Sequence, residues 1–370
     1  MDFILMKTGM KKRLLLLRYL VKWGYRYTRQ SLRNCVKRVL LPSRKPYYDP
    51  RLEFLGQYIL HVTRIRPIWA ITCDVRSSWA AREGAGSQAF QIMRTISFAR
   101  ASGLTYLHSP FSIIHHPDRP MPEWVAAWEK VFNLGAGEAP CDGLRRGVIN
   151  NDYNLADLDL CFGWSERTKQ PDNWFKALIP EFRRKYYLNK SPRTTHEVGI
   201  AVHIRRGDVS ASQNNTMYTS TEKVLAISSA VKAMLELRGV ANTIRVYGQG
   251  KLADFTELSP LGAEYFLDAD PIWTMQELVE ADILVLAKSC FSYCAGLISD
   301  GIKVFDPFGN PNADDVIIPP YGWALFSELD DWLPCQEDGS FDRVAFDHQL
   351  ALLLQAKRKA GVGEPARQGG

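Results

Sequence analysis

The feature that most constrains the fold is a short apolar segment that ends in charged residues. It spans residues 198–209 and reads VGIAVHIRRGDV. Its polar side chains gather after the apolar run, at His203, Arg205, Arg206 and Asp208. This pattern is typical of a buried strand that runs into a loop, and in open α/β sheets ligands bind at the carboxyl ends of strands. Adjacent arginines make paired hydrogen bonds to phosphate oxygens, so the predicted ligand is an anion such as a diphosphate.

Helix and strand patterns alternate along the chain after this segment. The pattern predicts strands at 243–250, 264–270, 281–288 and 301–308, and helices at 221–238, 251–257, 274–280 and 346–357. Such alternation is typical of a doubly wound α/β domain with a parallel sheet. We therefore predict a C-terminal domain over residues 196–356, followed by a disordered tail at 357–370.

A first domain is expected over residues 46–195. It contains a predicted strand at 68–75, a helical pattern at 88–101 that ends at Gly103, and a strand at 104–107. Gly84 and Gly86 precede this helix, and glycine suits a turn where the backbone must approach another group closely. A glycine turn before a helix is only a weak sign of phosphate binding, since it also serves as a packing turn.

A second predicted helix start follows the strand at 281–288. Ser289 is a favourable N-cap residue for it, and helix N-termini bind phosphates through their free N–H groups. Ser289 and Ser292 can add hydroxyl donors to such a site. Taken alone, this segment is better explained by an ordinary cap with Phe291 and Tyr293 in the core.

Three of these segments resemble one family. HIRRGDV is similar to the His-x-Arg-Arg-Gly-Asp signature of GDP-fucose-dependent fucosyltransferases, the α1,2 family most of all and the α1,6 and protein O-fucosyltransferases more distantly. The stretch from Gly84 to Gln88 resembles the Gly-x-Gly-Asn-Gln segment of bacterial α1,2-fucosyltransferases, with Ser87 in place of Asn. The stretch from Ser289 to Tyr293 resembles the Ser/Thr-Phe-Ser/Gly-aromatic turn of the family. The resemblance covers about Ile71 to Phe308, and the motifs occur in the family's order.

The resemblance implies a GT-B-like fold, with two Rossmann-like domains that face a cleft and a C-terminal domain that binds the nucleotide sugar. It implies an inverting transfer of fucose from GDP-fucose to a glycan hydroxyl, without a metal ion. The catalytic residues expected are Arg206 and Asp208, with Asp208 as the first choice of general base. The donor-binding residues expected are His203, Arg205, Arg206, Gly84, Gly86, Gln88, Asp268, Ser289, Phe291 and Ser292.

One departure leaves the recognition of the base open. The wider family places acidic residues after the strand that begins at Thr243, whereas this chain has Gly248, Gln249 and Gly250. Asp268 or Asp270 is therefore expected to accept hydrogen bonds from the guanine edge. These two residues also have the spacing of a metal motif, but a nucleotide role is preferred.

Residues 1–45 carry 13 Lys and Arg against one acid, Asp2, which is a net charge of +12, so with a total of +6 the remaining chain carries −6. This distribution argues against a nucleic-acid-binding protein. Arg18 and Lys22 interrupt the best candidate for a membrane-spanning helix. Residues 1–45 are predicted to form a basic amphipathic leader on an anionic membrane surface, with a solvated basic leader as the alternative. Seven scattered cysteines form no disulfide framework, which favours a reducing compartment. The resemblance implies a cytoplasmic location, peripheral on the inner face of the membrane.

Several interpretations stay open from the sequence alone. The acceptor implied by the resemblance is a bacterial lipopolysaccharide or capsule precursor, but the donor can be another nucleotide sugar. The chain can also be an inactive membrane-peripheral scaffold. His115 and His116 fit a surface loop or an acceptor site. Trp124 and Trp128 fit either the core or a platform for an acceptor sugar.

Overall fold

The computed structural model describes residues 68–73, 84–143, 147–150, 176–193, 197–307, 329 and 331–362. All of them belong to one compact unit, Gln57–Gly370. The predicted basic leader lies outside the described residues. None of the helices in the described ranges is long and apolar enough to cross a lipid bilayer.

The larger of the two sheets has six strands, and every neighbouring pair is parallel. Its strands are β5 (Val198–Ile204), β6 (Asn242–Gly248), β7 (Glu264–Leu267), β8 (Ile283–Leu286), β9 (Ile302–Phe305) and β10 (Trp332–Pro334). The order across the sheet is β10-β9-β8-β5-β6-β7. Read by chain order, this is the 3-2-1-4-5-6 arrangement of dinucleotide-binding folds, whose ligands lie where the order reverses. That switch point falls between β5 and β8.

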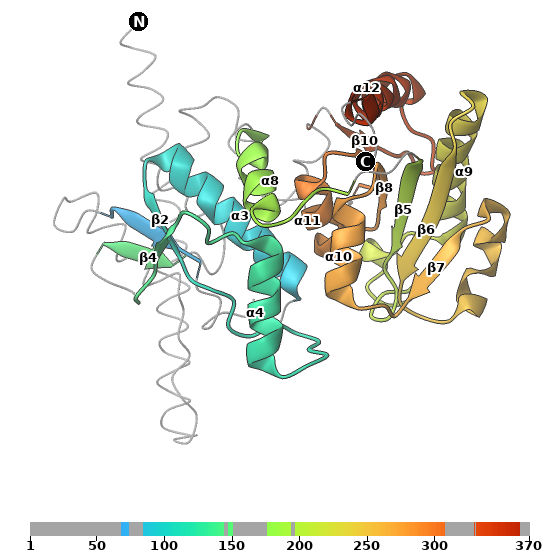
Figure 1. The fold of residues 1–370 in the computed structure, drawn as a ribbon. Helices are drawn as coiled ribbons and strands as arrows, with labels where there is room; N and C mark the ends of the chain where they lie inside the picture. The colour runs from blue at the N-terminus through green and yellow to red at the C-terminus, as the bar shows by residue number, and fades with distance from the viewer. Residues whose placement is uncertain are drawn as a thin grey trace, which may run out of the picture. The chain divides into compact units, whose positions relative to one another are not determined.

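Helices alternate with these strands, as predicted. They are α9 (Thr221–Leu237), α10 (Pro271–Val279), α11 (Cys290–Ile298) and α12 (Arg343–Val362), with 3-10 turns η3 (Asn215–Met217) and η4 (Leu252–Leu261). Apolar side chains of α9, such as Val224 and Val231, pack in the core with strand residues such as Val202 and Val246. Glu277 of α10 instead contacts Tyr247, whose side chain lies on the other face of β6. Figure 1 shows α9 and α10 on opposite sides of these strands, which is the doubly wound arrangement.

The smaller sheet is also parallel and has the order β3-β2-β1-β4. Its strands are β1 (Ala70–Thr72), β2 (Thr105–His108), β3 (Ala139–Pro140) and β4 (Val148–Asn150), and its helices are α3 (Ala85–Ser102), α4 (Met121–Phe132) and α8 (Ile179–Tyr187). The mixed α/β class with parallel sheets is thus confirmed. The division near residue 195 into two domains that face a cleft stays a prediction.

Element boundaries differ from the sequence predictions in a few places. Helix α3 begins at Ala85 rather than Gln88 and ends, as predicted, at Gly103, which takes the left-handed conformation with φ of 70°. Helix α12 begins at Arg343 because Asp342 caps it, accepting hydrogen bonds from two backbone N–H groups. The helix continues to Val362, so residues 357–362 of the predicted disordered tail are helical.

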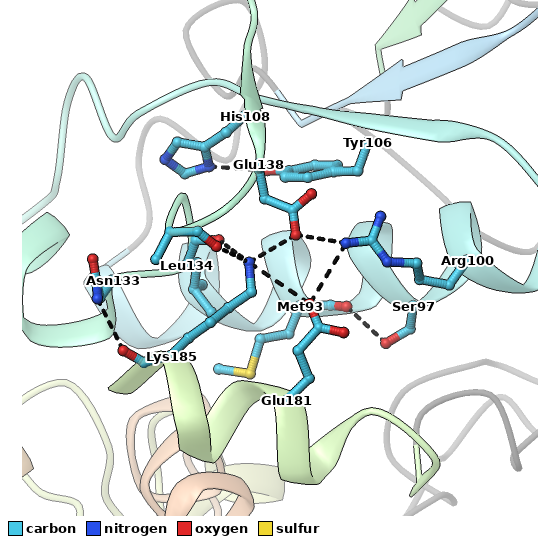
Figure 2. A network of polar contacts seen from close by, with 11 residues as sticks. Met93, Ser97, Arg100, Tyr106, His108, Asn133, Leu134, Glu138, Glu181 and Lys185 are labelled. Atoms are coloured by element: carbon cyan, nitrogen blue, oxygen red, sulfur yellow. Dashed lines mark hydrogen bonds and ion pairs between the residues drawn. The ribbon is translucent and has the colours of Figure 1, made fainter. Parts of the chain in front are cut away.

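A buried lysine fixes the turn between α4 and β3 (Figure 2). Lys185 of α8 is almost fully buried, and its ammonium group donates to Leu134 O at 2.9 Å, Ala136 O at 2.8 Å and Glu138 Oε1 at 2.7 Å. Arg100 of α3 donates to the same oxygen of Glu138. All three ammonium protons are used, so this charge holds α8, α3 and the turn 133–138 together. The sequence analysis missed this lysine.

Candidate functional site

The site is built first from the carboxyl end of β5. His203, the second-last residue of this strand, forms a short hydrogen bond through Nδ1 with Ser292 Oγ of α11. Its ring also packs on Phe291, with 5.5 Å between the ring centroids. Burial and the nearby charge of Arg205 lower the pKa of His203 to about 3. His203 is therefore neutral at physiological pH and joins the end of β5 to the first turn of α11.

Helix α11 starts directly after β8, the strand beside β5 at the switch point. Ser289 is its N-cap, as predicted, and Ser289 Oγ accepts a hydrogen bond of 3.2 Å from the Phe291 N–H. Ser292, one turn into the helix, is fully buried. The first turn of a helix leaves backbone N–H groups without intrahelical partners and carries partial positive charge.

The first turn of α3 packs on the first turn of α11. A Cβ atom on Gly86 would lie 2.6 Å from Phe291 Cα and 2.9 Å from Phe291 N. The Cys294 thiol donates to Gly86 O at 2.9 Å. Because only a residue without a side chain allows this approach, Gly86 is a packing glycine between the two helices. Gly84, by contrast, is the N-cap of α3 and has open space beside its Cα.

Three segments that lie far apart in the sequence therefore meet at one place. Gly86 contacts Phe291, and Phe291 contacts His203. The first turns of two helices thus meet beside the end of the strand at the switch point. Helix N-termini at such a point bind phosphates and other anions. Anion binding at this place stays a prediction.

The two arginines of the motif have separate partners. Arg205 pairs with Asp208, with 2.8 Å between Arg205 Nη2 and Asp208 Oδ2. Arg206 donates to Arg205 O at 2.9 Å and to Thr221 Oγ1 at 3.1 Å, and its guanidinium lies 4.6 Å from the centre of the Tyr218 ring. The structure therefore directs Arg206 toward the start of α9. A combined grip of both arginines on one phosphate stays a prediction.

Asp208 is the predicted general base. Its hydrogen bond to Arg205 is the main cause that lowers the pKa of Asp208, and the charge of His116 lowers it further. A carboxylate with a lowered pKa is ionised at neutral pH but binds a proton more weakly. Its role as the base stays a prediction.

Two further predicted donor residues lie beside these segments. Gln88 is buried in α3, and its Nε2 donates to Ile113 O at 2.8 Å. Asp268 follows β7 in the left-handed conformation, with φ of 51°, and its Oδ2 accepts from the Gly250 N–H at 3.4 Å. The carboxyl ends of β5 and β7 meet at the same edge of the sheet, but recognition of a base by Asp268 stays a prediction.

Sequence reasoning missed a buried carboxylate at the same edge. Asp306 follows β9 and is 5% exposed. It binds Lys223 at 2.8 Å, Lys288 at 2.9 Å and Thr219 Oγ1 at 2.9 Å. These contacts tie the start of α9 to the residue that precedes the N-cap of α11. Asp306 lies inside the strand predicted at 301–308 but directly follows the observed β9 (Ile302–Phe305). With the strand end placed correctly, the rule that polar groups gather at the carboxyl ends of strands would have identified it.

The structure decides the role of the two tryptophans but not that of the two histidines. Trp124 and Trp128 of α4 are 2% and 1% exposed, so they belong to the core rather than to a sugar platform. Trp128 also contacts Phe291 edge to face. His115 and His116 are exposed in the loop between β2 and α4. Among the described residues, no group of three or more His, Cys, Asp or Glu side chains is arranged to hold a metal ion.

Comparisons with known proteins give only distant likenesses. No family model matches the chain. No curated protein matches it either. Among solved structures, POFUT1 in complex with GDP is 14% identical with a TM-score of 0.32, over 65% of this chain and 98% of that chain. POFUT1 in complex with GDP-fucose is 13% identical with a TM-score of 0.33, over 65% and 97%.

A variant of the wall teichoic acid polymerase TagF is 10% identical to this chain, with a TM-score of 0.25 over 70% of this chain and 67% of that chain. Identities and TM-scores of this size assign neither a family nor an activity. The functional argument therefore depends on the residues and contacts of this chain.

Proposed function

We propose that this chain is an inverting glycosyltransferase that moves fucose from GDP-fucose to a hydroxyl of a glycan acceptor. One observation carries the proposal: His203, Gly86 and the turn at Phe291 meet at the switch point of a 3-2-1-4-5-6 sheet. Each of the three belongs to a segment that resembles a fucosyltransferase motif. A chance resemblance gives no reason for the three segments to contact one another.

The proposed reaction places negative charge where the site can stabilise it. The bond between the anomeric carbon and the phosphate oxygen breaks through a transition state with oxocarbenium character, while the acceptor oxygen approaches from the opposite face. The electron pair of the broken bond stays on the departing GDP. The N–H groups of the first turn of α11 and the guanidinium groups of Arg205 and Arg206 are fixed charges and dipoles that stabilise this developing charge.

The first test is calorimetric binding of GDP and GDP-fucose without added metal. We expect wild-type binding, and at least a tenfold loss of affinity for Arg206→Ala. Arg238→Ala is the matched control, because Arg238 pairs with Asp347 at the C-terminal end of α9. The 17 residues of α9 place that end ~25 Å from its N-terminus. Circular dichroism must show that both variants fold.

The same experiment separates the alternatives. Preference for another nucleotide sugar in a donor panel indicates a glycosyltransferase with a different donor. Absence of binding by the wild type refutes the proposal and favours a membrane-peripheral scaffold. The proposal has three further parts. The acceptor is a precursor of bacterial lipopolysaccharide or capsule, and the reaction needs no metal ion. The protein lies at the inner face of the cytoplasmic membrane.

A further inference from the structure

The loop between β2 and α4, residues 109–120, is fixed at three points. The Phe111 N–H donates to Glu129 Oε1 at 2.6 Å, and Gln88 of α3 donates to Ile113 O at 2.8 Å. At the other end, Arg119 donates to Asp270 Oδ2 at 2.6 Å. Asp270 caps α10, which follows β7. The β2–α4 loop therefore runs from the first turns of α3 to the carboxyl end of β7.

His116 lies between these fixed points and is exposed. Its backbone is left-handed, with φ of 56°, a conformation that few residues other than glycine adopt. His115 contacts it, with 4.1 Å between the ring centroids. The charge of His116 lowers the pKa of Asp208, which lies in the loop after β5. An exposed imidazole is thus held near the loop that carries the predicted arginines.

The proposed reaction needs a group that takes the proton of the acceptor hydroxyl. Asp208 is poorly suited, because its pair with Arg205 weakens its attraction for a proton. Imidazole is the side chain that takes up and releases protons most readily near neutral pH. His116 is reached from solvent, as an acceptor must be, and it belongs to a segment tied to both α3 and α10.

We propose that His116 is the general base of the transfer, an inference that rests on the proposed function. One nitrogen of the imidazole takes the proton of the acceptor hydroxyl as its oxygen forms the new bond to the anomeric carbon. The bond from that carbon to the phosphate oxygen breaks, and its electron pair leaves with GDP. Asp208 stabilises the imidazolium that forms.

Among the residues that the structure describes, the charged or titratable groups near His116 come from its own loop and from the loop after β5. His115 is its ring neighbour, and Asp118 and Arg119 follow it in the loop, where they form an ion pair. From the loop after β5, Asp208 interacts electrostatically with His116, and Arg205 pairs with Asp208. Two ion pairs, Asp208–Arg205 and Asp118–Arg119, therefore supply the charges near this imidazole.

The test compares His116→Asn with His115→Asn. Asparagine tolerates the left-handed conformation but takes up no proton near neutral pH. The assay follows GDP release from GDP-fucose, with lactose as the acceptor and with water alone. For His116→Asn we expect kcat to fall ~10²- to 10⁴-fold, the usual contribution of a general base, with GDP-fucose affinity unchanged. For His115→Asn we expect kcat within a few-fold of wild type.

Two further measurements identify the base. The fall of kcat toward acid pH in the wild type is expected to be absent in His116→Asn. Added imidazole is expected to restore part of the rate to His116→Gly. Retained kcat in His116→Asn, or an unchanged acid limb, overturns the role of His116 and leaves the proposed function intact. Absence of donor binding, or donor binding without any GDP release by the wild type, overturns the proposed function and this inference together.

Discussion

Gly86→Ala is the substitution whose effect the structure predicts most sharply. Gly86 lies in the first turn of α3, and an added methyl group would stand 2.6 Å from Phe291 Cα, 2.9 Å from Phe291 N and 3.2 Å from Cys290 C. All three are backbone atoms in the first turn of α11. Because a helix backbone cannot rotate aside as a side chain does, the methyl group has to push the two helices apart.

Two effects of opposite sign decide how much Gly86→Ala changes the free energy of unfolding. Alanine stabilises a helix relative to glycine by up to ~1 kcal/mol. Overpacking in a tightly packed core costs ~1 to 3 kcal/mol. Contacts below 3.0 Å with backbone put this site at the upper end of that range, so we expect a net destabilisation of ~1 to 2 kcal/mol. GDP affinity should also fall at least tenfold, because the movement of α11 separates Ser292 from His203.

The assay is urea denaturation, with Gly84→Ser as the matched control. Gly84 lies two residues earlier, is the N-cap of α3 with extended backbone, and has no atom within 4 Å of an added Cβ. Serine is a better N-cap residue than glycine, so we expect stability unchanged or slightly raised. If Gly86→Ala is as stable as the wild type or more stable, helix propensity outweighs packing and the proposed contact between α3 and α11 is refuted.

Three other predictions follow from buried charges. Lys185→Met should lower the free energy of unfolding by ~3 to 5 kcal/mol in urea denaturation, because it leaves two buried carbonyl oxygens without a donor and Glu138 with Arg100 alone. A loss below ~1 kcal/mol would contradict this. The pKa of His203 is lowered to about 3, so NMR should show no titration of this residue between pH 5 and 8. The stability that neutral His203 contributes should be lost as the pH falls from ~6.5 toward 3. Burial lowers the pKa of Lys303 to about 8. Between pH 8 and ~10.4 the unfolded chain therefore keeps the proton on this lysine while the folded chain has lost it, so the free energy of unfolding should rise with pH over that interval. In denaturation curves, Lys303→Met should remove this rise.

Much of the fold follows from local sequence. The alternation of apolar strands and amphipathic helices after Val198 predicts a parallel α/β sheet. Neighbouring positions are enough to show it, because they carry both the spacing of apolar residues and the turn residues. Ser289 was predicted as an N-cap and Gly103 as a helix end, and both are confirmed. These features depend on backbone conformations that a few adjacent residues set. The same reasoning placed the polar cluster that starts at His203 at the end of a strand.

Some local predictions were displaced by packing or capping. The helix predicted from Gln88 starts at Ala85: Gly84 is its N-cap, and Gly86 lies in its first turn, where it packs on α11. Trp124 and Trp128 are buried, although their helical spacing fits an exposed platform equally well. Spacing shows that side chains share a face, but not what covers that face.

The sequence by itself determined most elements between Val198 and Phe305, their order and the polar cluster at the carboxyl end of β5, but it did not predict β3, β4, α8 or β10. Only the tertiary structure decided that β8 lies beside β5, which brings Ser292 to His203 across 88 intervening residues. It also decided that Arg206 turns toward Thr221 and that Asp306 collects two lysines. Strand order and side-chain partners depend on contacts between distant segments, and local propensity carries no information about them.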